Sequence, residues 1–227
     1  MLINENLNRF AEADTNEIEW VASPSEGVER KMLERDGDEV ARATTIVRFA
    51  PGSSFPEHDH GEGEEFLVLD GVFSDETGDY PAGTYVRNPK GTVHAPSTKE
   101  GCTIFVKLRQ FQDDDDKQVV IDTNSAEWQA HEVEGITYLP LHQHGEEYVR
   151  LSRYAPGTRF PFHQHPLGEE VFVLDGVLTD EKGNYPTGTW VRYPAGSGHR
   201  PFSYEGCTLY VKSGHLPPPP AGEDEGA

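Results

Sequence analysis

The stretch that decides the fold is APGSSFPEHDHGEGEEFLVLDG at residues 50–71, which returns as APGTRFPFHQHPLGEEVFVLDG at residues 155–176. At an offset of 105 residues, segments 50–107 and 155–212 align without a gap, and 34 of their 58 positions are identical. Unrelated segments do not agree to this extent, so the chain contains two copies of one domain.

The limits of the two copies follow from a looser match upstream, where Glu19-Trp20 corresponds to Glu127-Trp128. The acidic run 113–116 lies between the copies and is expected to form an exposed linker. We therefore predict a first domain over residues 1–116, with a short irregular N-terminal arm, and a second over residues 117–216. Residues 217–227, PPPPAGEDEGA, are predicted to be a disordered tail because prolines and acidic residues cannot build a packed element.

Within each copy the apolar residues alternate with polar ones, which predicts short strands joined by glycine-rich turns. The first strand of each copy is expected to end at a glycine, Gly71 or Gly176. An all-β fold of hairpins, stacked as a sandwich or barrel, follows from this pattern. The predicted strands cover residues 64–70, 84–87 and 103–107 in the first copy and 169–175, 189–192 and 208–212 in the second.

Each copy also carries a set of metal-binding side chains. His58 and His60 are two residues apart, so on a strand both imidazoles point to one face. Glu64 begins the next predicted strand, and His94 arrives from a later one. Neighbouring strands lie about 5 Å apart, which is close enough for the four side chains to share one ion. The second copy repeats this set with His163, His165, Glu169 and His199.

Three imidazoles and one carboxylate suit a divalent first-row metal, with iron, zinc, nickel, manganese and copper all compatible. We expect one ion per domain, with coordination positions left open for water, substrate or dioxygen. The neighbouring carboxylates Glu65 and Glu170 would replace the assigned ones if the strand register slipped by one residue.

Three further pairs of residues have side chains that could bind a ligand or react: His142 with His144, Cys102 with Cys207, and Arg87 with Arg192. The histidine pair has no counterpart in the first copy and is expected on a strand surface, with a contact at the rim of the site as the alternative. The cysteines occupy matching positions and are expected to be small buried hydrophobes, with a redox role as the alternative. The arginines are expected to form structural ion pairs, with contact to an anionic substrate as the alternative.

These motifs resemble those of a known family. Residues 52–71 read G-x5-H-x-H-x3-E-x6-G, which resembles the first cupin motif, and residues 83–94 read G-x5-P-x-G-x2-H, which resembles the second. Both recur at 157–176 and 188–199, although Thr98 and Ser203 stand where the second motif has asparagine. More narrowly, GVFSDETGDYPAGTYVRNP (71–89) and EGCTIFVKL (100–108) resemble the ChrR-like cupin domain.

The resemblance implies two tandem jelly-roll-like β-barrels and a metal-dependent function. The leading hypothesis is a non-haem dioxygenase acting on a small oxygenated, diketone-like molecule. One alternative is a stress- or ligand-sensing regulator related to the anti-sigma factor ChrR, whose H-x3-C-x2-C domain has no counterpart here. Another is a binding module that the metal only stabilises. Four aromatic residues are candidates for the pocket lining: Phe66, Tyr85, Phe172 and Trp190.

The net charge of −21 argues against binding to nucleic acid or anionic lipid, because such a surface repels phosphate. The sequence shows no membrane span and no signal peptide, so we expect a cytoplasmic protein. The expected partner is a small molecule. Cupin barrels pair through strands, so a homodimer and a single chain of two paired halves both remain open.

Overall fold

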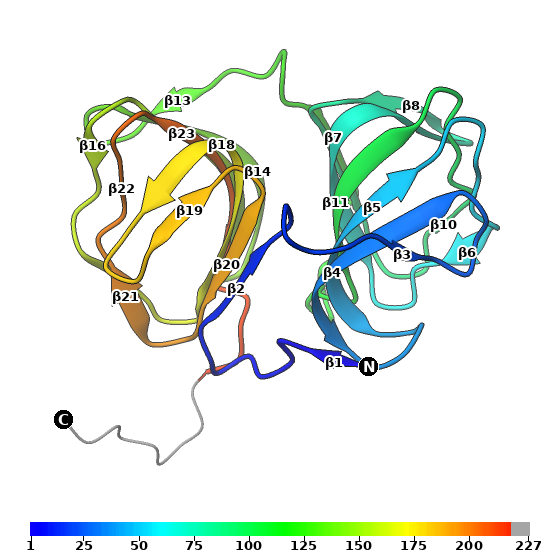
Figure 1. Ribbon diagram of the computed structural model, residues 1–227, viewed down its shortest axis with the longest axis horizontal. Coiled ribbons are helices and arrows are strands. Elements are labelled where there is room, and N and C mark those ends of the chain that lie inside the picture. The colour runs from blue at the N-terminus through cyan, green and yellow to red at the C-terminus, as the bar shows by residue number, and fades with distance from the viewer. Residues whose placement is uncertain (219–227) are drawn as a thin grey trace. The chain divides into compact units, whose positions relative to one another are not determined.

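The computed structural model describes residues 1–218, and those residues form strands and connecting segments without any helix. The prediction of an all-β chain is therefore confirmed. Two compact units make up the structure (Figure 1). The first unit consists of Met1–Glu5 and Glu17–Ala126, and the second of Asn6–Asn16 and the chain from Glu127 onward. The predicted tail lies outside the described residues apart from Pro217 and Pro218.

The first unit is built on one antiparallel sheet with the strand order β1-β4-β5-β11-β7-β9-β12. Strand β3 pairs with β4, β8 pairs with β7, and β6 pairs with β10 in a separate small sheet. The bounds are β1 (Leu2–Ile3), β3 (Val21–Ala22), β4 (Val28–Asp36), β5 (Arg42–Phe49), β6 (His58–Asp59), β7 (Glu64–Asp75), β8 (Gly78–Pro81), β9 (Thr84–Asn88), β10 (Val93–His94), β11 (Cys102–Leu108) and β12 (Val119–Asp122).

The second unit repeats this arrangement with the order β13-β14-β15-β23-β18-β20-β2. Strands β16, β19 and β22 extend it, and β17 pairs with β21 as β6 does with β10. The bounds are β2 (Ala11–Asp14), β13 (Gln129–Ala130), β14 (Ile136–His144), β15 (Glu147–Tyr154), β16 (Thr158–Arg159), β17 (His163–His165), β18 (Glu169–Thr179), β19 (Asn184–Pro186), β20 (Thr189–Tyr193), β21 (Ser197–His199), β22 (Phe202–Ser203) and β23 (Cys207–Ser213).

Two edge strands belong to units that the sequence repeat does not indicate. Strand β2 precedes the tryptophan of the first copy, yet it pairs with β20 in the second unit (Figure 1). Strand β12 follows residue 117, yet it pairs with β9 in the first unit. The repeat records which segments are related, whereas the compact units record which strands share hydrogen bonds. The two therefore divide the chain at different places.

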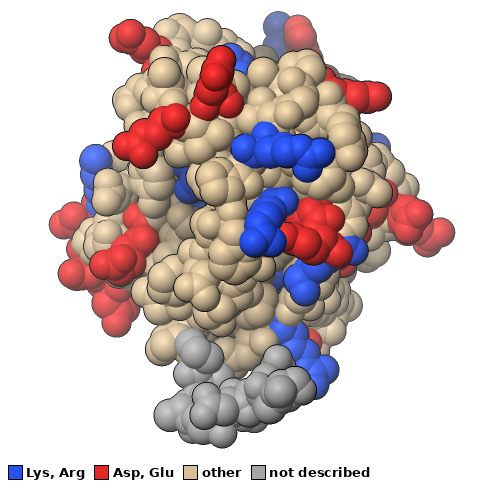
Figure 2. Space-filling model, turned by 90° about the vertical axis from the view of Figure 1, so that its left-hand side faces the viewer, with Lys and Arg blue, Asp and Glu red and all other residues tan. Residues whose placement is uncertain are grey.

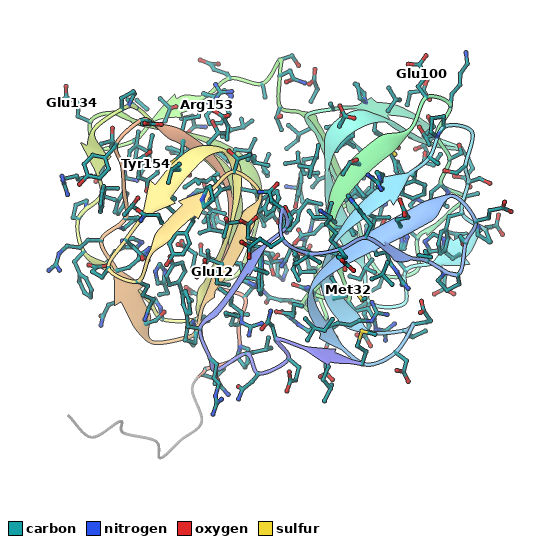
Figure 3. The ribbon with its side chains drawn as sticks, viewed as in Figure 1. Glu12, Met32, Glu100, Glu134, Arg153 and Tyr154 are labelled. Atoms are coloured by element: carbon teal, nitrogen blue, oxygen red, sulfur yellow. The ribbon has the colours of Figure 1, made fainter. Side chains whose placement is uncertain are left out.

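The core of each unit follows the two-residue period of its strands. On β15, Arg153 is exposed and stacks on Trp128, whereas Tyr154 packs against the core of its unit (Figure 3). The core of the first unit contains Val28, Phe49, Phe66, Val68, Phe73, Tyr80, Val86, Cys102, Ile104 and Val106. That of the second contains Val171, Val173, Leu178, Tyr185, Val191, Tyr193, Cys207, Leu209 and Val211.

The glycines predicted to end the first strands do not end them. Strand β7 continues past Gly71 to Asp75, and β18 continues past Gly176 to Thr179. Both glycines adopt a positive φ, +72° and +77°, beside a register irregularity in the pairing with the neighbouring strand. The strand therefore bends at the glycine and pairs with a new neighbour beyond it, which is how β7 reaches β8.

The surface is charged, as the composition predicts. Figure 2 shows acidic and basic side chains interspersed on the face that it presents. The acidic run was expected to be fully exposed, but Asp115 is buried and its carboxylate accepts a hydrogen bond from Arg87. The described residues include no helix that is long and apolar enough to cross a membrane.

The motif glycines provide a test of this fold. A Cβ atom at Gly71 would lie 2.1 Å from the carbonyl oxygen of Gly101, whereas one at Gly52 would meet nothing within 4 Å. Both glycines have a positive φ of similar size, so Gly52→Ala measures the backbone penalty alone, about 1–2 kcal/mol. We expect Gly71→Ala to destabilise the protein clearly more in urea unfolding. Equal midpoints for the two variants would contradict the close approach.

Candidate metal centres

In the first unit the structure brings together the four side chains that the sequence singled out. Strands β6 and β10 place His58 directly opposite His94, while Glu64 is the first residue of β7. The Nε2 atoms of His60 and His94 are 3.0 Å apart, and Glu64 Oε1 lies 3.5 Å and 3.6 Å from them. One potential ligand atom from each of the four residues lies within 4.8 Å of every other.

The second unit forms the same cluster from its own copy of the motif. His163 is opposite His199 in the pairing of β17 with β21, and Glu169 begins β18. The ring centroids of His163, His165 and His199 are 4.7–4.9 Å apart. Glu169 Oε1 lies 3.7 Å from His199 Nε2. These four residues also offer ligand atoms that are all within 4.8 Å of one another.

Hydrogen bonds on the outer side of the rings fix which nitrogen faces the cluster. His58 Nδ1 donates to the carbonyl oxygen of Pro56 at 2.9 Å. The hydroxyl of Thr92 donates to Pro89 and so accepts from His60 Nδ1, also at 2.9 Å. Because Nδ1 carries the proton in both rings, Nε2 presents a lone pair to the cluster.

A carboxylate lies on the outer side of the last histidine of each cluster, and in the second unit it accepts this hydrogen bond. His199 Nδ1 is 3.0 Å from Asp180 Oδ2, and Asp180 also accepts hydrogen bonds from Tyr185 at 2.9 Å and Tyr193 at 2.6 Å. Burial would raise the pKa of Asp180, but the hydrogen bonds from His199 and Tyr193 hold it below its usual range. In the first unit Asp75 Oδ2 lies 3.5 Å from His94 Nδ1.

His60 and His165 are neutral at physiological pH. Burial, with His94 and His58 nearby, lowers the pKa of His60 to about 3, and burial lowers that of His165 to about 4. A neutral imidazole can donate its lone pair to a metal, whereas a protonated one cannot. The Nε2 atoms of His60 and His94 lie 3.0 Å apart, within hydrogen-bond distance, and a cation bound between them would take the place of the proton that they share.

The two carboxylates have different surroundings. Burial raises the pKa of Glu64 to about 7, although Asn88 donates a hydrogen bond to it. Burial also acts on Glu169, but His165 and Arg150 oppose it and lower the pKa overall. Arg150 Nη2 lies 3.5 Å from Glu169 Oε2. The second centre thus has a cationic side chain beside its carboxylate at a position where the first unit has Thr45.

The neighbouring carboxylates point to the opposite face of their strands. Glu65 accepts hydrogen bonds from Tyr85 at 2.8 Å and Arg87 at 2.7 Å, so Arg87 forms the structural ion pair expected of it. Glu170 accepts from Trp190 at 3.1 Å. Tyr85 and Trp190 therefore bind these carboxylates rather than line a pocket with the clusters. Phe66 lies in the core of the first unit, whereas Phe172 shares the strand face of Glu170.

A cavity of about 470 Å³ opens onto the cluster of the first unit. His58, His60 and Glu64 contribute to its lining at one end. The remaining wall is mainly apolar and comes from alternate residues of β5 and β11 together with core aromatics: Val47, Phe49, Phe55, Phe73, Ile104, Val106 and Leu108. This cavity could not be predicted from the sequence, because its shape depends on which strands pair.

The donor set of both clusters fits a divalent first-row metal. Glu64 Oε1, His165 Nε2 and His199 Nε2 are buried and have no hydrogen-bond partner among the described residues. Buried polar atoms are normally paired, so unpaired ones that converge on a point indicate a ligand. Imidazole and carboxylate ligands in this combination suit iron, manganese, nickel or zinc.

Of the other residues singled out, the two cysteines are where they were expected and one histidine is not. Cys102 and Cys207 are buried at 3% and 5% exposure. His142 was expected on a strand surface but is buried at 4% exposure, while His144 is half-buried. The register of β14 shifts between Pro140 and His142, which interrupts the alternation that the prediction assumed.

The sequence matches the family model of the ChrR cupin-like domain twice, over residues 8–112 and 116–217. The chain belongs to this family. It contains two tandem cupin domains, as the internal repeat predicts. No curated protein matches the sequence.

Solved structures similar to this cupin share its fold. A provisionally assigned dioxygenase from Nostoc punctiforme superposes with a TM-score of 0.77 at 15% identity, covering 92% of this chain and 84% of that one. An oxalate decarboxylase from Lactobacillus farciminis, in complex with formate, gives 0.63 at 14% identity, covering 92% and 87%. An oxalate decarboxylase from Bacillus subtilis with Mn(II) centres gives 0.62 at 13% identity, covering 95% and 80%.

Single histidine replacements test the two centres separately. We expect His60→Ala and His165→Ala each to remove one metal equivalent per chain, because each variant loses one of four donors in a different unit. His144→Ala is the matched control and should keep both equivalents. Metal analysis by mass spectrometry of protein reconstituted with Mn²⁺ or Zn²⁺ measures the content. Two equivalents in both of the first variants would disprove the ligand assignment.

The cysteines allow a test of the redox alternative. Burial raises the pKa of Cys102 and of Cys207 to about 11, so almost no reactive thiolate is present at pH 8. We expect a chromogenic disulfide reagent to titrate neither thiol in the native protein and both in guanidinium. Ser replacements should leave the response to peroxide unchanged. Rapid titration of either native thiol would restore the redox hypothesis.

Proposed function

We propose that this chain is a metal-dependent dioxygenase that acts on a small oxygenated, diketone-like molecule. The observation that supports the proposal most directly is the position of the first cluster at the end of an apolar cavity. A site of this kind combines a few convergent polar groups with a water-excluding wall, as small-molecule sites commonly do. The fold of the Nostoc protein agrees with the proposal but does not identify a reaction.

The chain's own residues prepare this site in three ways. Pro56 and Thr92 orient two imidazoles so that their Nε2 atoms face the centre. Burial keeps the His60 ring neutral, so it can act as a metal ligand without first losing a proton. The apolar wall excludes water from the side of the cluster that faces the cavity. An iron, manganese or nickel ion held there would supply the redox chemistry that dioxygen requires.

A sensing role is the second candidate, and the cavity beside the cluster also favours it. A small molecule bound beside the metal would change the stability of the unit, which is sufficient for a signal. A zinc ion would serve this role, since zinc has no redox chemistry. The identity of the bound metal therefore separates the two functions.

Metal analysis of anaerobically purified protein, with an oxygen electrode alongside, tests the proposal. We expect close to two equivalents of a redox-active metal and oxygen uptake on addition of small diketones. His94→Ala, in the first unit, should abolish uptake, because it removes a ligand of the centre that faces the cavity. His144→Ala should leave uptake unchanged. Two equivalents of zinc without uptake for any chelating compound would reject the dioxygenase and favour the sensor.

A further inference from the structure

The two copies agree in their metal-binding residues but differ in the residues around them. Strand pairing identifies which residues of the two copies correspond. Val47 and Ser152 are equivalent positions of the repeat and pair with Arg30 and Tyr138 respectively, so Tyr138 is the counterpart of Arg30. In the same way, the equivalent positions Ala43 and Tyr148 lie opposite Arg35 and Gln143. Both arginines line the first cavity, and the second copy has an uncharged residue at each position. The first cavity thus has two cationic side chains with no charged counterpart in the second copy.

Arg30 and Arg35 give this part of the wall a surplus of positive charge. Arg30 donates to both carboxylate oxygens of Glu39, at 3.0 Å and 3.2 Å. Arg35 is buried and donates to the backbone carbonyl of Asp38, while the Asp38 carboxylate pairs with the N-terminal amine at 2.9 Å. Two guanidinium groups therefore share one lining carboxylate, Glu39.

The surroundings of these arginines show room for a further anion. Arg30 Nε is buried and has no hydrogen-bond partner among the described residues. Burial and the adjacent charge of Arg30 lower the pKa of Arg35, as expected for two cations close together in a poorly solvated site. A carboxylate in the cavity would offset the repulsion between the two cations, and guanidinium groups bind carboxylates through paired hydrogen bonds. A third lining arginine, Arg109, is already paired with Glu62 at 2.7 Å.

The rest of the cavity suits an apolar molecule. Strand β5 turns Val47 and Phe49 toward the cavity, while Arg48 between them points to the opposite face, where it pairs with Glu29 at 2.6 Å. Phe73 adds an aromatic surface next to the cluster, with its ring centroid 5.9 Å from that of His94. Cationic groups, an apolar wall and the metal cluster therefore line a single cavity.

We infer that the first cavity binds a small carboxylic acid with an apolar body, whose carboxylate pairs with Arg35 and Arg30. The inference rests on the proposed function, since it names the substrate class for the same site. The apolar body lies along Val47, Phe49 and Phe73, and directs the other end of the molecule toward the histidine cluster.

A pair of probes that differ only in charge tests the inference. Calorimetric titration of the metal-loaded protein with 3-phenylpropionate and with 3-phenylpropionamide should show one equivalent of the acid bound at least about tenfold more tightly than the amide. Arg35→Met should remove most of this preference, and Arg30→Met a part of it, with the affinity for the amide unchanged. Arg48→Met is the matched control on the same sheet and should keep the full preference.

Two outcomes would overturn the inference. One is equal affinity for the acid and the amide in the unaltered protein. The other is a preference that survives in both arginine variants and disappears when the metal is removed, because the acid would then bind the metal alone. The metal content of each sample is also measured, so that the test of the carboxylate site can be distinguished from the test of the proposed metal-dependent function. A preference for the acid in protein that binds no metal would support the carboxylate site and refute the proposed function.

Discussion

The first unit depends on the convergence of imidazole and carboxylate donors that a cation would bind. The Nε2 atoms of His60 and His94 lie 3.0 Å apart, and a buried oxygen of Glu64 without a hydrogen bond lies 3.5 Å from the first of them. Hydrogen bonds on the outer side orient two of the rings, His58 to the carbonyl of Pro56 and His60 to the hydroxyl of Thr92, while the carboxylate of Asp75 lies 3.5 Å from Nδ1 of His94. The sheet, the bend at Gly71 and these outer hydrogen bonds together hold four donors where a metal ion would bind them.

Much of this arrangement could be predicted from the sequence. The two-residue spacing of His58 and His60 places them on one strand face, and the repeat supplies the same set a second time. The strand parity also separates Glu64 from Glu65 once the register is known. The sequence does not show whether the strand ends at Gly71 or continues beyond it. A glycine with a positive φ can form either a turn that ends a strand or a bend within one. It could not predict the burial of Asp115 either, since that depends on the distant Arg87.

The comparison of the two units separates what the metal requires from what the cavity recognises. The four cluster positions carry the same residue types in both copies. The aspartate that contacts the last histidine of each cluster, Asp75 or Asp180, is also the same. The surrounding wall has changed, with Thr45 in one unit and Arg150 in the other beside the carboxylate. Duplication followed by change at the wall would allow one chain to hold two similar metals in different chemical surroundings.

The pairing of β2 with β20 and of β12 with β9 has a consequence for how the chain folds during synthesis. The first unit lacks an edge strand until residues 119–122 have left the ribosome, which is after the first repeat is complete. Residues 11–14 must wait for β20, so they remain unpaired while most of the chain is made. A fragment cut at the boundary of the repeat would leave a sheet edge open to pairing with other chains. Gene fusions or truncations of this protein therefore need to keep β2 with the second unit and β12 with the first, rather than follow the boundary of the repeat.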